Sequence, residues 1–214
     1  MQVLSRVLSY AVDPLGKIAS NPCEGIKQLY SGDRSDIIWA DSDIATLKKT
    51  CSPEIAHAVD LASHTGLRLG DLLRLSWVHV GEDAITLPTG KSRRRRGAII
   101  PLCDDLRALL VRIPRNSTTV LTNSKHRPWT AAGFGSSFNT AKKKAGLANK
   151  ELHFHDLRGT AATKFYVAGL SVRVIAEILA WSEDQVERII RRYVGRAAAT
   201  KEIIRQLNEA KKRT

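Results

Sequence analysis

Cysteine is scarce in this chain of 214 residues, and its spacing excludes two common structural devices. The three cysteines, Cys23, Cys51 and Cys103, are far apart and odd in number, and no two of them form a Cys-x-x-Cys pair. Neither a disulfide framework nor a zinc knuckle fits this arrangement. The sequence therefore predicts reduced thiols, as in a cytoplasmic protein.

Long apolar runs, internal repeats and low-complexity tracts are also lacking. No apolar run approaches the roughly 18 residues that span a bilayer. The N-terminal residues 1–7 do not have the pattern of a secretory signal. We therefore expect a cytoplasmic protein with no membrane partner.

Acidic residues are too few to balance the basic ones. The chain has 34 Lys and Arg against 21 Asp and Glu, which gives a net charge of +13. Such an excess favours a polyanionic partner, most often nucleic acid. The alternative is a basic soluble protein with no such partner.

The sequence predicts a short N-terminal segment and one larger domain. Residues 1–34 contain a short apolar helix and a polar link, too little for a core of their own, and we interpret them as the remnant of an upstream domain. From residue 35 to residue 214 the pattern is mostly helical, with a small three-stranded antiparallel sheet, an α+β fold. The expected strands are 77–80, 84–87 and 98–100. The expected helices begin at 41 or 42 and then span 53–65, 70–75, 104–111, 130–145, 155–168, 172–180, 184–193 and 198–212.

Tyr193 lies in a dense basic context near the C-terminus, between Arg191-Arg192 and Arg196. A phenol has a reference pKa near 10, and nearby cations or a general base reduce the cost of ionising it. A tyrosine among arginines is thus a candidate nucleophile toward a phosphodiester. The alternative is a half-buried aromatic residue at the end of an amphipathic helix.

Further candidates for phosphate chemistry come earlier in the chain. Arg68 follows a Thr-Gly-Leu turn, and His155 and Arg158 are three residues apart, on one face of a helix. A guanidinium can bind two phosphate oxygens, and an imidazole can transfer a proton near neutral pH. Each of these residues alone is also compatible with an ordinary surface role, and Arg68 could form a simple surface pair with Asp71.

A predicted turn carries the other basic candidates. Lys91 lies in this turn as a mobile charge that could donate a proton. The four residues Arg93, Arg94, Arg95 and Arg96 are candidate DNA-phosphate contacts or, alternatively, a solvated basic loop. His153 and His155 have no further ligand set nearby, so no metal site is predicted.

In their order, these segments resemble the catalytic domain of the tyrosine recombinases, the phage-type integrases. The matching segments are Thr65-Gly-Leu-Arg68-Leu-Gly-Asp-Leu-Leu, the lysine turn that ends in Ile99-Ile-Pro-Leu, His155-Asp-Leu-Arg158-Gly-Thr-Ala-Ala-Thr, and Arg191-Arg-Tyr193. Asn21-Pro22 is similar to the lead-in to that domain, so residues 1–34 would be the remnant of the family's core-binding domain and 35–214 the catalytic domain.

The resemblance implies roles for six residues. Arg68 and Arg158 would clamp the scissile phosphate, Lys91 would protonate the departing 5′-hydroxyl, and His155 would act in proton transfer. Tyr193 would form a 3′-phosphotyrosine bond, which needs no cofactor. Where the family usually has Gly-His, this chain has Ala180-Trp181, and the indole N–H of Trp181 would donate to a phosphate oxygen in place of the histidine. Twelve positions separate Trp181 from Tyr193, more than the common spacing.

The resemblance thus implies a site-specific recombinase that cleaves and rejoins double-stranded DNA and self-associates on it, as a tetramer in the family. Two alternatives remain open. One is a truncated, catalytically silent DNA-binding relic on the same fold, motivated by the short N-terminal segment and Trp181. The other is a basic helical RNA-binding protein, which rests on charge alone.

Overall fold

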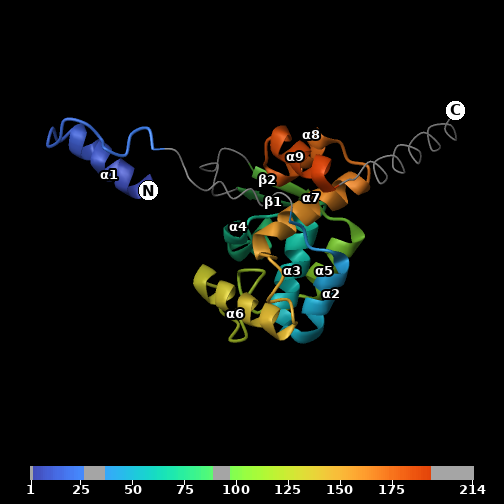
Figure 1. Cartoon of the computed structure of the whole chain (residues 1–214). Helices are drawn as coiled ribbons and strands as arrows, with labels where there is room; N and C mark the ends of the chain where they lie inside the picture. Colours follow the sequence, from blue (N-terminus) through green and yellow to red (C-terminus); the bar gives the residue numbers. More distant parts are fainter. Residues whose placement is uncertain (1, 27–36, 89–96, 194–214) are drawn as a thin grey trace, which may run out of the picture. The chain divides into compact units, whose positions relative to one another are not determined.

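The computed structural model describes residues 2–26, 37–88 and 97–193, with the backbone alone at positions 2, 192 and 193. Contacts divide the chain into two compact units, Met1–Asp33 and Arg34–Thr214 (Figure 1). In the first unit, the Asn21 side chain donates hydrogen bonds to Ser5 O at 2.9 Å and to Ser9 Oγ at 2.8 Å, both on helix α1 (Gln2–Val12). That this unit is a domain remnant stays a prediction.

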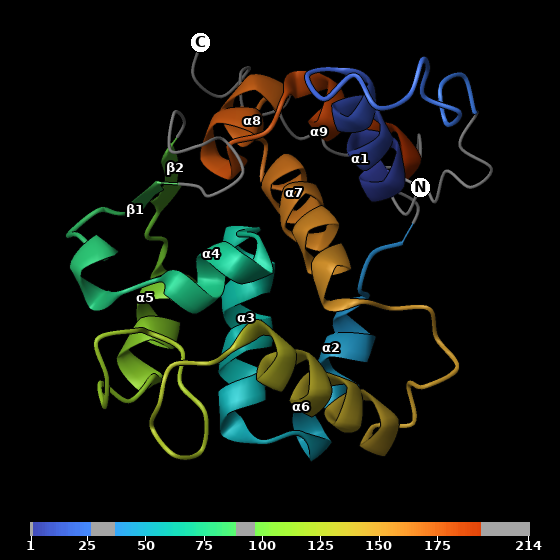
Figure 2. The same ribbon diagram turned by 90° about the vertical axis from the view of Figure 1, so that its left-hand side faces the viewer.

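The described part of the second unit is built around one central helix, α3. Its helices are α2 (Asp41–Thr50), α3 (Pro53–Thr65), α4 (Leu69–Arg74), α5 (Asp104–Arg112), α6 (Ala131–Lys144), α7 (Leu157–Val167), α8 (Val172–Leu179) and α9 (Glu183–Tyr193). Helix α3 packs against α2, α5, α6 and α7 (Figure 2). The expected helix over 198–212 lies outside the described residues.

Local signals account for where several helices begin and end. Ser52 precedes α3 as N-cap with Pro53 at the first helical position, and Gly66 ends the helix in the left-handed conformation, at φ +60°. The Thr130 hydroxyl accepts a hydrogen bond from Gly133 N at 3.1 Å and caps α6. These caps explain why the expected and observed helix bounds agree closely.

The sheet has two strands in the described residues, so the expectation of three was wrong in this detail. Strands β1 (Ala84–Pro88) and β2 (Gly97–Pro101) pair antiparallel, with Ile85 opposite Ile100. Ile85, Leu87, Ala98 and Ile100 are buried, whereas the residues between them are not, as expected for a sheet with one covered face.

The expected first strand forms a 3₁₀ turn, η1 (Trp77–His79), instead. The His79 ring accepts a hydrogen bond from Ser76 N at 3.1 Å and thereby closes the turn. Val80 keeps only a single bridge to Ile85. The alternation in a four-residue segment was too short to exclude this local side-chain hydrogen bond.

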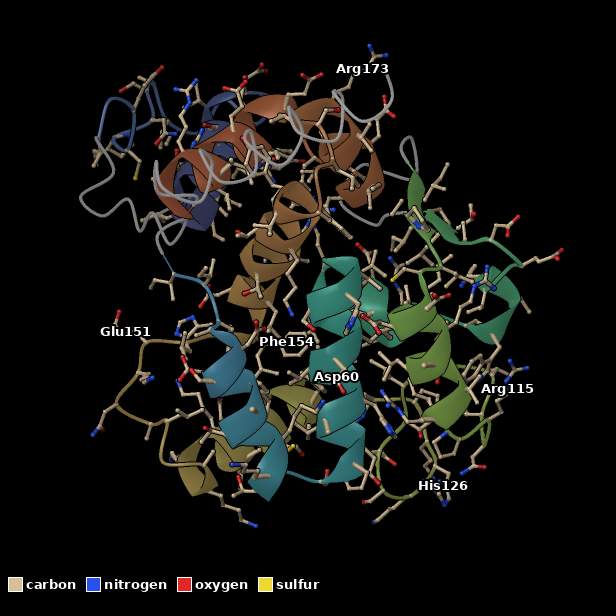
Figure 3. All side chains as sticks on the ribbon, turned by 90° about the vertical axis from the view of Figure 1, so that its right-hand side faces the viewer. Asp60, Arg115, His126, Glu151, Phe154 and Arg173 are labelled. Atoms are coloured by element: carbon tan, nitrogen blue, oxygen red, sulfur yellow. The ribbon has the colours of Figure 1, made fainter. Side chains whose placement is uncertain are left out.

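Helix α7 lies in one apolar core and meets different neighbours at its two ends. At its start, Phe154 of the 3₁₀ turn η2 (Phe154–Asp156) points inward (Figure 3) and packs edge-on against Phe134 and Phe138 of α6, with ring centroids 4.8 and 5.3 Å apart. At its other end, α8 covers β2 and packs against α9. The chain before α2 is fixed to α7, because Trp39 N donates to Thr160 Oγ1 at 2.9 Å. Across the described ranges, the structure has no helix with the length and apolarity that a membrane crossing requires.

Candidate active site

Arg158 is a buried arginine in the first turn of α7, with only 4% of its surface exposed. Its Nε donates a hydrogen bond to Gly66 O at 2.8 Å, which joins α7 to the corner between α3 and α4. Its Nη2 is also buried and has no hydrogen-bond partner among the described residues. Because buried donors are almost always paired, this nitrogen marks a place where a ligand oxygen would bind.

The electrostatics of Arg158 favour an anion. Burial, and then the positive charge of Arg68, lower the pKa of Arg158 well below its ordinary value, to about 9, while Asp71 acts in the opposite direction. At pH 7 the guanidinium therefore keeps its charge, in an environment that penalises it. A bound phosphate would offset both the burial and the repulsion between the two arginines.

Arg68 precedes α4 as its N-cap residue, and its half-buried side chain approaches Asp71. Arg68 Nη1 is 4.0 Å from Asp71 Oδ2, and Arg74 Nη2 is 2.5 Å from Asp71 Oδ1. Asp71 itself is 3% exposed. The pair of Arg68 and Asp71 is thus not an ordinary surface pair, because its carboxylate lies inside the protein between two arginines.

Trp181 covers the guanidinium of Arg158. The Arg158 Cζ lies 4.5 Å from the centroid of the Trp181 ring, within the range of a cation–π interaction. The indole is half-buried and also lines a cleft of about 650 Å³ between β2 and the α8–α9 junction. Arg68, Arg158 and Trp181 are therefore linked through contacts and charge, although they come from three distant parts of the sequence.

Ala180, which precedes Trp181, ends α8 in the left-handed conformation, at φ +51°. Glycine is the usual residue at such a position because an alanine Cβ is strained there. We expect Ala180→Gly to raise the free energy of unfolding by about 0.5–1 kcal/mol, measured by urea denaturation.

Ala168 provides the matched control for this substitution. It follows the end of α7 in the same way, but at φ −73°. Ala168→Gly relieves no strain and should destabilise the protein by about 0.5–1 kcal/mol. Equal effects of the two substitutions would contradict the assignment of strain to Ala180.

His155 and Arg158 lie where the 3₁₀ turn η2 leads into α7. His155, in η2, is exposed, whereas Arg158, in the first turn of α7, is buried. The 3₁₀ turn is stabilised by a hydrogen bond from His153 N to Asp156 Oδ2 at 2.6 Å. That the two side chains act together on one phosphate stays a prediction.

The other predicted site residues lie wholly or partly outside the described residues. Those that lie wholly outside are Lys91, Arg93, Arg94, Arg95 and Arg96. Tyr193 is the last residue of α9, and its backbone alone is described. The eleven residues between Trp181 and Tyr193 belong almost entirely to this one helix.

Sequence reasoning did not identify two residues that shape the site. Asp71 was read as a possible partner of Arg68, but its burial was not predicted. Gly66 directly follows the expected helix over 53–65, and its carbonyl accepts the Arg158 hydrogen bond. The sequence signal available for Gly66 and Asp71 was the Gly-Leu-Arg turn that ends at Arg68, followed by an acidic residue three positions later. Within the described ranges, no three His, Cys, Asp or Glu residues form a group that could hold a metal ion.

With this geometry established, the chain can be compared with known proteins. Residues 40–199 match the model of the phage integrase family, and the chain belongs to that family. It is 32% identical over 135 residues to a shufflon-specific DNA recombinase of Escherichia coli, covering 62% of this chain and 32% of the relative. It is 26% identical over 161 residues to the integrase of Escherichia phage HK022, covering 69% and 44%. The chain thus spans less than half the length of either relative.

Solved structures confirm the fold. A lambda integrase dimer bound to a COC′ core site superimposes with a TM-score of 0.71 at 21% identity, covering 91% of this chain and 58% of that one. XerA recombinase gives a TM-score of 0.60 at 19% identity, with 79% and 65% covered. The mostly helical catalytic-domain fold that the motifs predicted is therefore confirmed.

Proposed function

We propose that this chain is the catalytic part of a site-specific DNA recombinase that cleaves and rejoins strands through a 3′-phosphotyrosine. The observation that carries the proposal is the buried, charged Arg158, whose Nη2 has no partner among the described residues and whose neighbour Arg68 adds a second positive charge. Two neighbouring guanidinium groups suit a phosphodiester, whose charge builds on the non-bridging oxygens as the nucleophile attacks.

In the proposed reaction, the Tyr193 oxygen attacks the scissile phosphorus while the bond to the 5′-oxygen breaks. Arg68 and Arg158 stabilise the charge that develops, and Lys91 gives a proton to the departing 5′-oxygen. His155 assists proton transfer, and the Trp181 indole N–H donates to a phosphate oxygen. The 5′-hydroxyl of a second strand then attacks the phosphotyrosine and releases the tyrosine. Bond energy is conserved, so the scheme needs no cofactor.

The packing of α9 supports the assignment of Tyr193. Ile189 Cγ2 lies 4.0 Å from the position that a Cβ on Gly159 would occupy, and Gly159 directly follows Arg158. Tyr193 comes four residues after Ile189, about 6 Å further along the helix. Helix α9 is thus packed against α7 next to Arg158, which supports Tyr193 at the end of α9 as the nucleophile.

We propose double-stranded DNA as the partner, with several copies assembled on it. The net charge of +13 supports DNA binding. The lambda integrase structures of the same fold include a dimer bound to a core site and a tetramer bound to a Holliday junction. The basic RNA-binding alternative has no comparable support, because it explains neither Arg158 nor the family match.

A nicked suicide substrate tests the proposed function directly. Because the target site is unknown, the protein would be incubated with a pool of nicked duplexes of randomised sequence, and covalent complexes would be recovered by phenol partition and sequenced. We expect an enriched sequence and an adduct joined to Tyr193, identified by mass spectrometry. In Tyr193→Phe the adduct should disappear, because no other phenol takes its place.

Two results would count against this assignment. An adduct that survives in Tyr193→Phe would exclude Tyr193 as the nucleophile. Specific DNA binding without any adduct in the wild type would instead favour the catalytically silent relic, and RNA binding without DNA selectivity would favour the third hypothesis.

A further inference from the structure

The orientation of Arg158 is fixed from two directions. At one edge of the guanidinium, Nε donates to Gly66 O at 2.8 Å. Across its face, the Trp181 ring lies 4.5 Å from Cζ. A hydrogen bond at the edge and an aromatic ring on the face together define the plane of the group, and they leave Nη2 as the donor without a partner among the described residues.

We propose that Trp181 is a positioning residue whose aromatic face, rather than its indole N–H alone, keeps Arg158 cationic and oriented. This inference rests on the proposed function, because it takes the phosphate as the ligand of Arg158. It adds a second role to Trp181, one that a histidine in the same position would fill less well because its ring is smaller. The indole N–H remains available for the donor role.

The charges around Arg158 explain why an aromatic face matters here. Arg68 repels the guanidinium and Asp71 attracts it, and both come from the α3–α4 corner. From the side of the α8–α9 junction, the contact is the neutral indole. The negative face of that ring stabilises a cation without neutralising it, so the arginine stays free to bind an anion. A carboxylate in the same place would compete with the phosphate.

A second pair in the same protein provides an internal comparison. Arg115, labelled in Figure 3, lies 4.5 Å over the ring of Trp77, the same distance as in the Arg158 pair. Arg115 is exposed, however, whereas Arg158 is buried. Cation–π attraction is stronger in a desolvated pair. Removing the Trp181 ring should therefore destabilise the charge of Arg158 more than removing the Trp77 ring destabilises the charge of Arg115.

The test is a titration of Arg158 in the protein without DNA. Arginine labelled with ¹³C at Cζ would be followed by NMR from pH 7 to 11, with the Arg158 signal assigned from its loss in Arg158→Lys. In Trp181→Leu, which removes the aromatic face, we expect the titration midpoint to fall by about one pH unit, a tenfold change in proton affinity. In Trp181→Phe, which keeps a smaller ring and loses the N–H, the midpoint should fall by clearly less than in Trp181→Leu.

The controls separate positioning from packing. Trp77→Leu should leave the Arg158 midpoint unchanged, and Trp181→Met replaces the leucine variant if that variant does not fold. Equal midpoints in the Phe and Leu (or Met) variants would overturn the proposal. The titration requires neither DNA nor Tyr193, so its failure is distinguishable from failure of the adduct experiment: an adduct without a midpoint shift refutes only the positioning role, and a shift without an adduct refutes only the proposed reaction.

Discussion

Arg158→Met is expected to slow strand cleavage by about 10²–10³ while leaving the protein as stable as the wild type, or up to about 2 kcal/mol more stable. Most substitutions of a residue that is 4% exposed destabilise a protein. Arg158 should differ because a charged guanidinium at this buried position costs the folded protein free energy. The lowering of its pKa to about 9 corresponds to roughly 5 kcal/mol against the charged form.

The interactions that oppose this penalty are individually smaller. The hydrogen bond from Nε to Gly66 O contributes about 1.5–3 kcal/mol, and the stack on Trp181 contributes about 1–2 kcal/mol. Methionine fills a similar volume without a charge. It loses both interactions and also the penalty, so the net change in stability should be small or favourable.

The effect of pH on this difference has a definite sign. The folded pKa of Arg158 is below the unfolded value, so below about pH 9 both states are protonated and the whole penalty acts on the folded protein. Above pH 9 the folded state loses its proton first, and the penalty shrinks as the pH rises toward the ordinary pKa of arginine. The stability advantage of Arg158→Met over the wild type should therefore be largest at neutral pH and decrease above pH 9.

Urea denaturation at pH 7 and pH 10, with the suicide-substrate assay at pH 7, measures both halves of this prediction. The adduct rate should fall by about 10²–10³, as on removal of one donor to a transition-state oxyanion. Arg173→Met is the control, since Arg173 lies exposed on α8 (Figure 3) and forms an ion pair with Glu177 at 3.4 Å. It should change stability by less than about 0.5 kcal/mol. A loss of more than 2 kcal/mol in Arg158→Met would show that the arginine is retained for folding.

Gly66→Ala is the substitution with the largest expected loss of stability. A Cβ at this position would stand 2.4 Å from Leu179 Cδ2 and 3.2 Å from Ala161 Cβ. The residue also has φ +60°, which costs an alanine about 1–2 kcal/mol. With about 1–3 kcal/mol for the crowding, the free energy of unfolding should fall by roughly 3 kcal/mol and the melting temperature by about 6–12 °C.

The same substitution should also reduce cleavage, because the Gly66 carbonyl positions Arg158. Calorimetry and the adduct assay on the folded fraction measure the two effects separately. Gly70→Ala is the matched control: Gly70 lies within α4, and a Cβ there meets nothing within 4 Å. That variant should be about 0.5–1 kcal/mol more stable than the wild type. If Gly66→Ala behaved like Gly70→Ala, the close packing of α3 against α7 and α8 would be wrong.

Much of the fold could be predicted because its signals are local. Ser52-Pro53 and Gly66 mark the two ends of α3, and the structure places the ends there. The same reasoning failed at Trp77–Val80, where the alternation suggested a strand. A hydrogen bond from Ser76 N to the His79 ring decided for a 3₁₀ turn, and alternation in four residues contains no information about such a bond.

The site was predictable as a set of residues but not as an arrangement. Arg68, Arg158 and Trp181 could be selected because the order of their motifs matches a family. Their geometry could not be predicted, since the hydrogen bond from Arg158 to Gly66 joins residues 92 positions apart. The burial of Asp71 could not be predicted either, because the three-residue spacing between Arg68 and Asp71 is the same in a surface pair and in a buried one.

The sequence by itself determined the family, the helical catalytic fold and the residue types that could act on a phosphate, because capping, periodicity and motif order are properties of neighbouring residues. The tertiary structure alone decided which charge is buried, that an indole covers it and that a glycine carbonyl holds its edge. These features depend on the packing of α3, α7 and α8 against one another. The free energy of a charged guanidinium depends on this local environment rather than on its position in the chain.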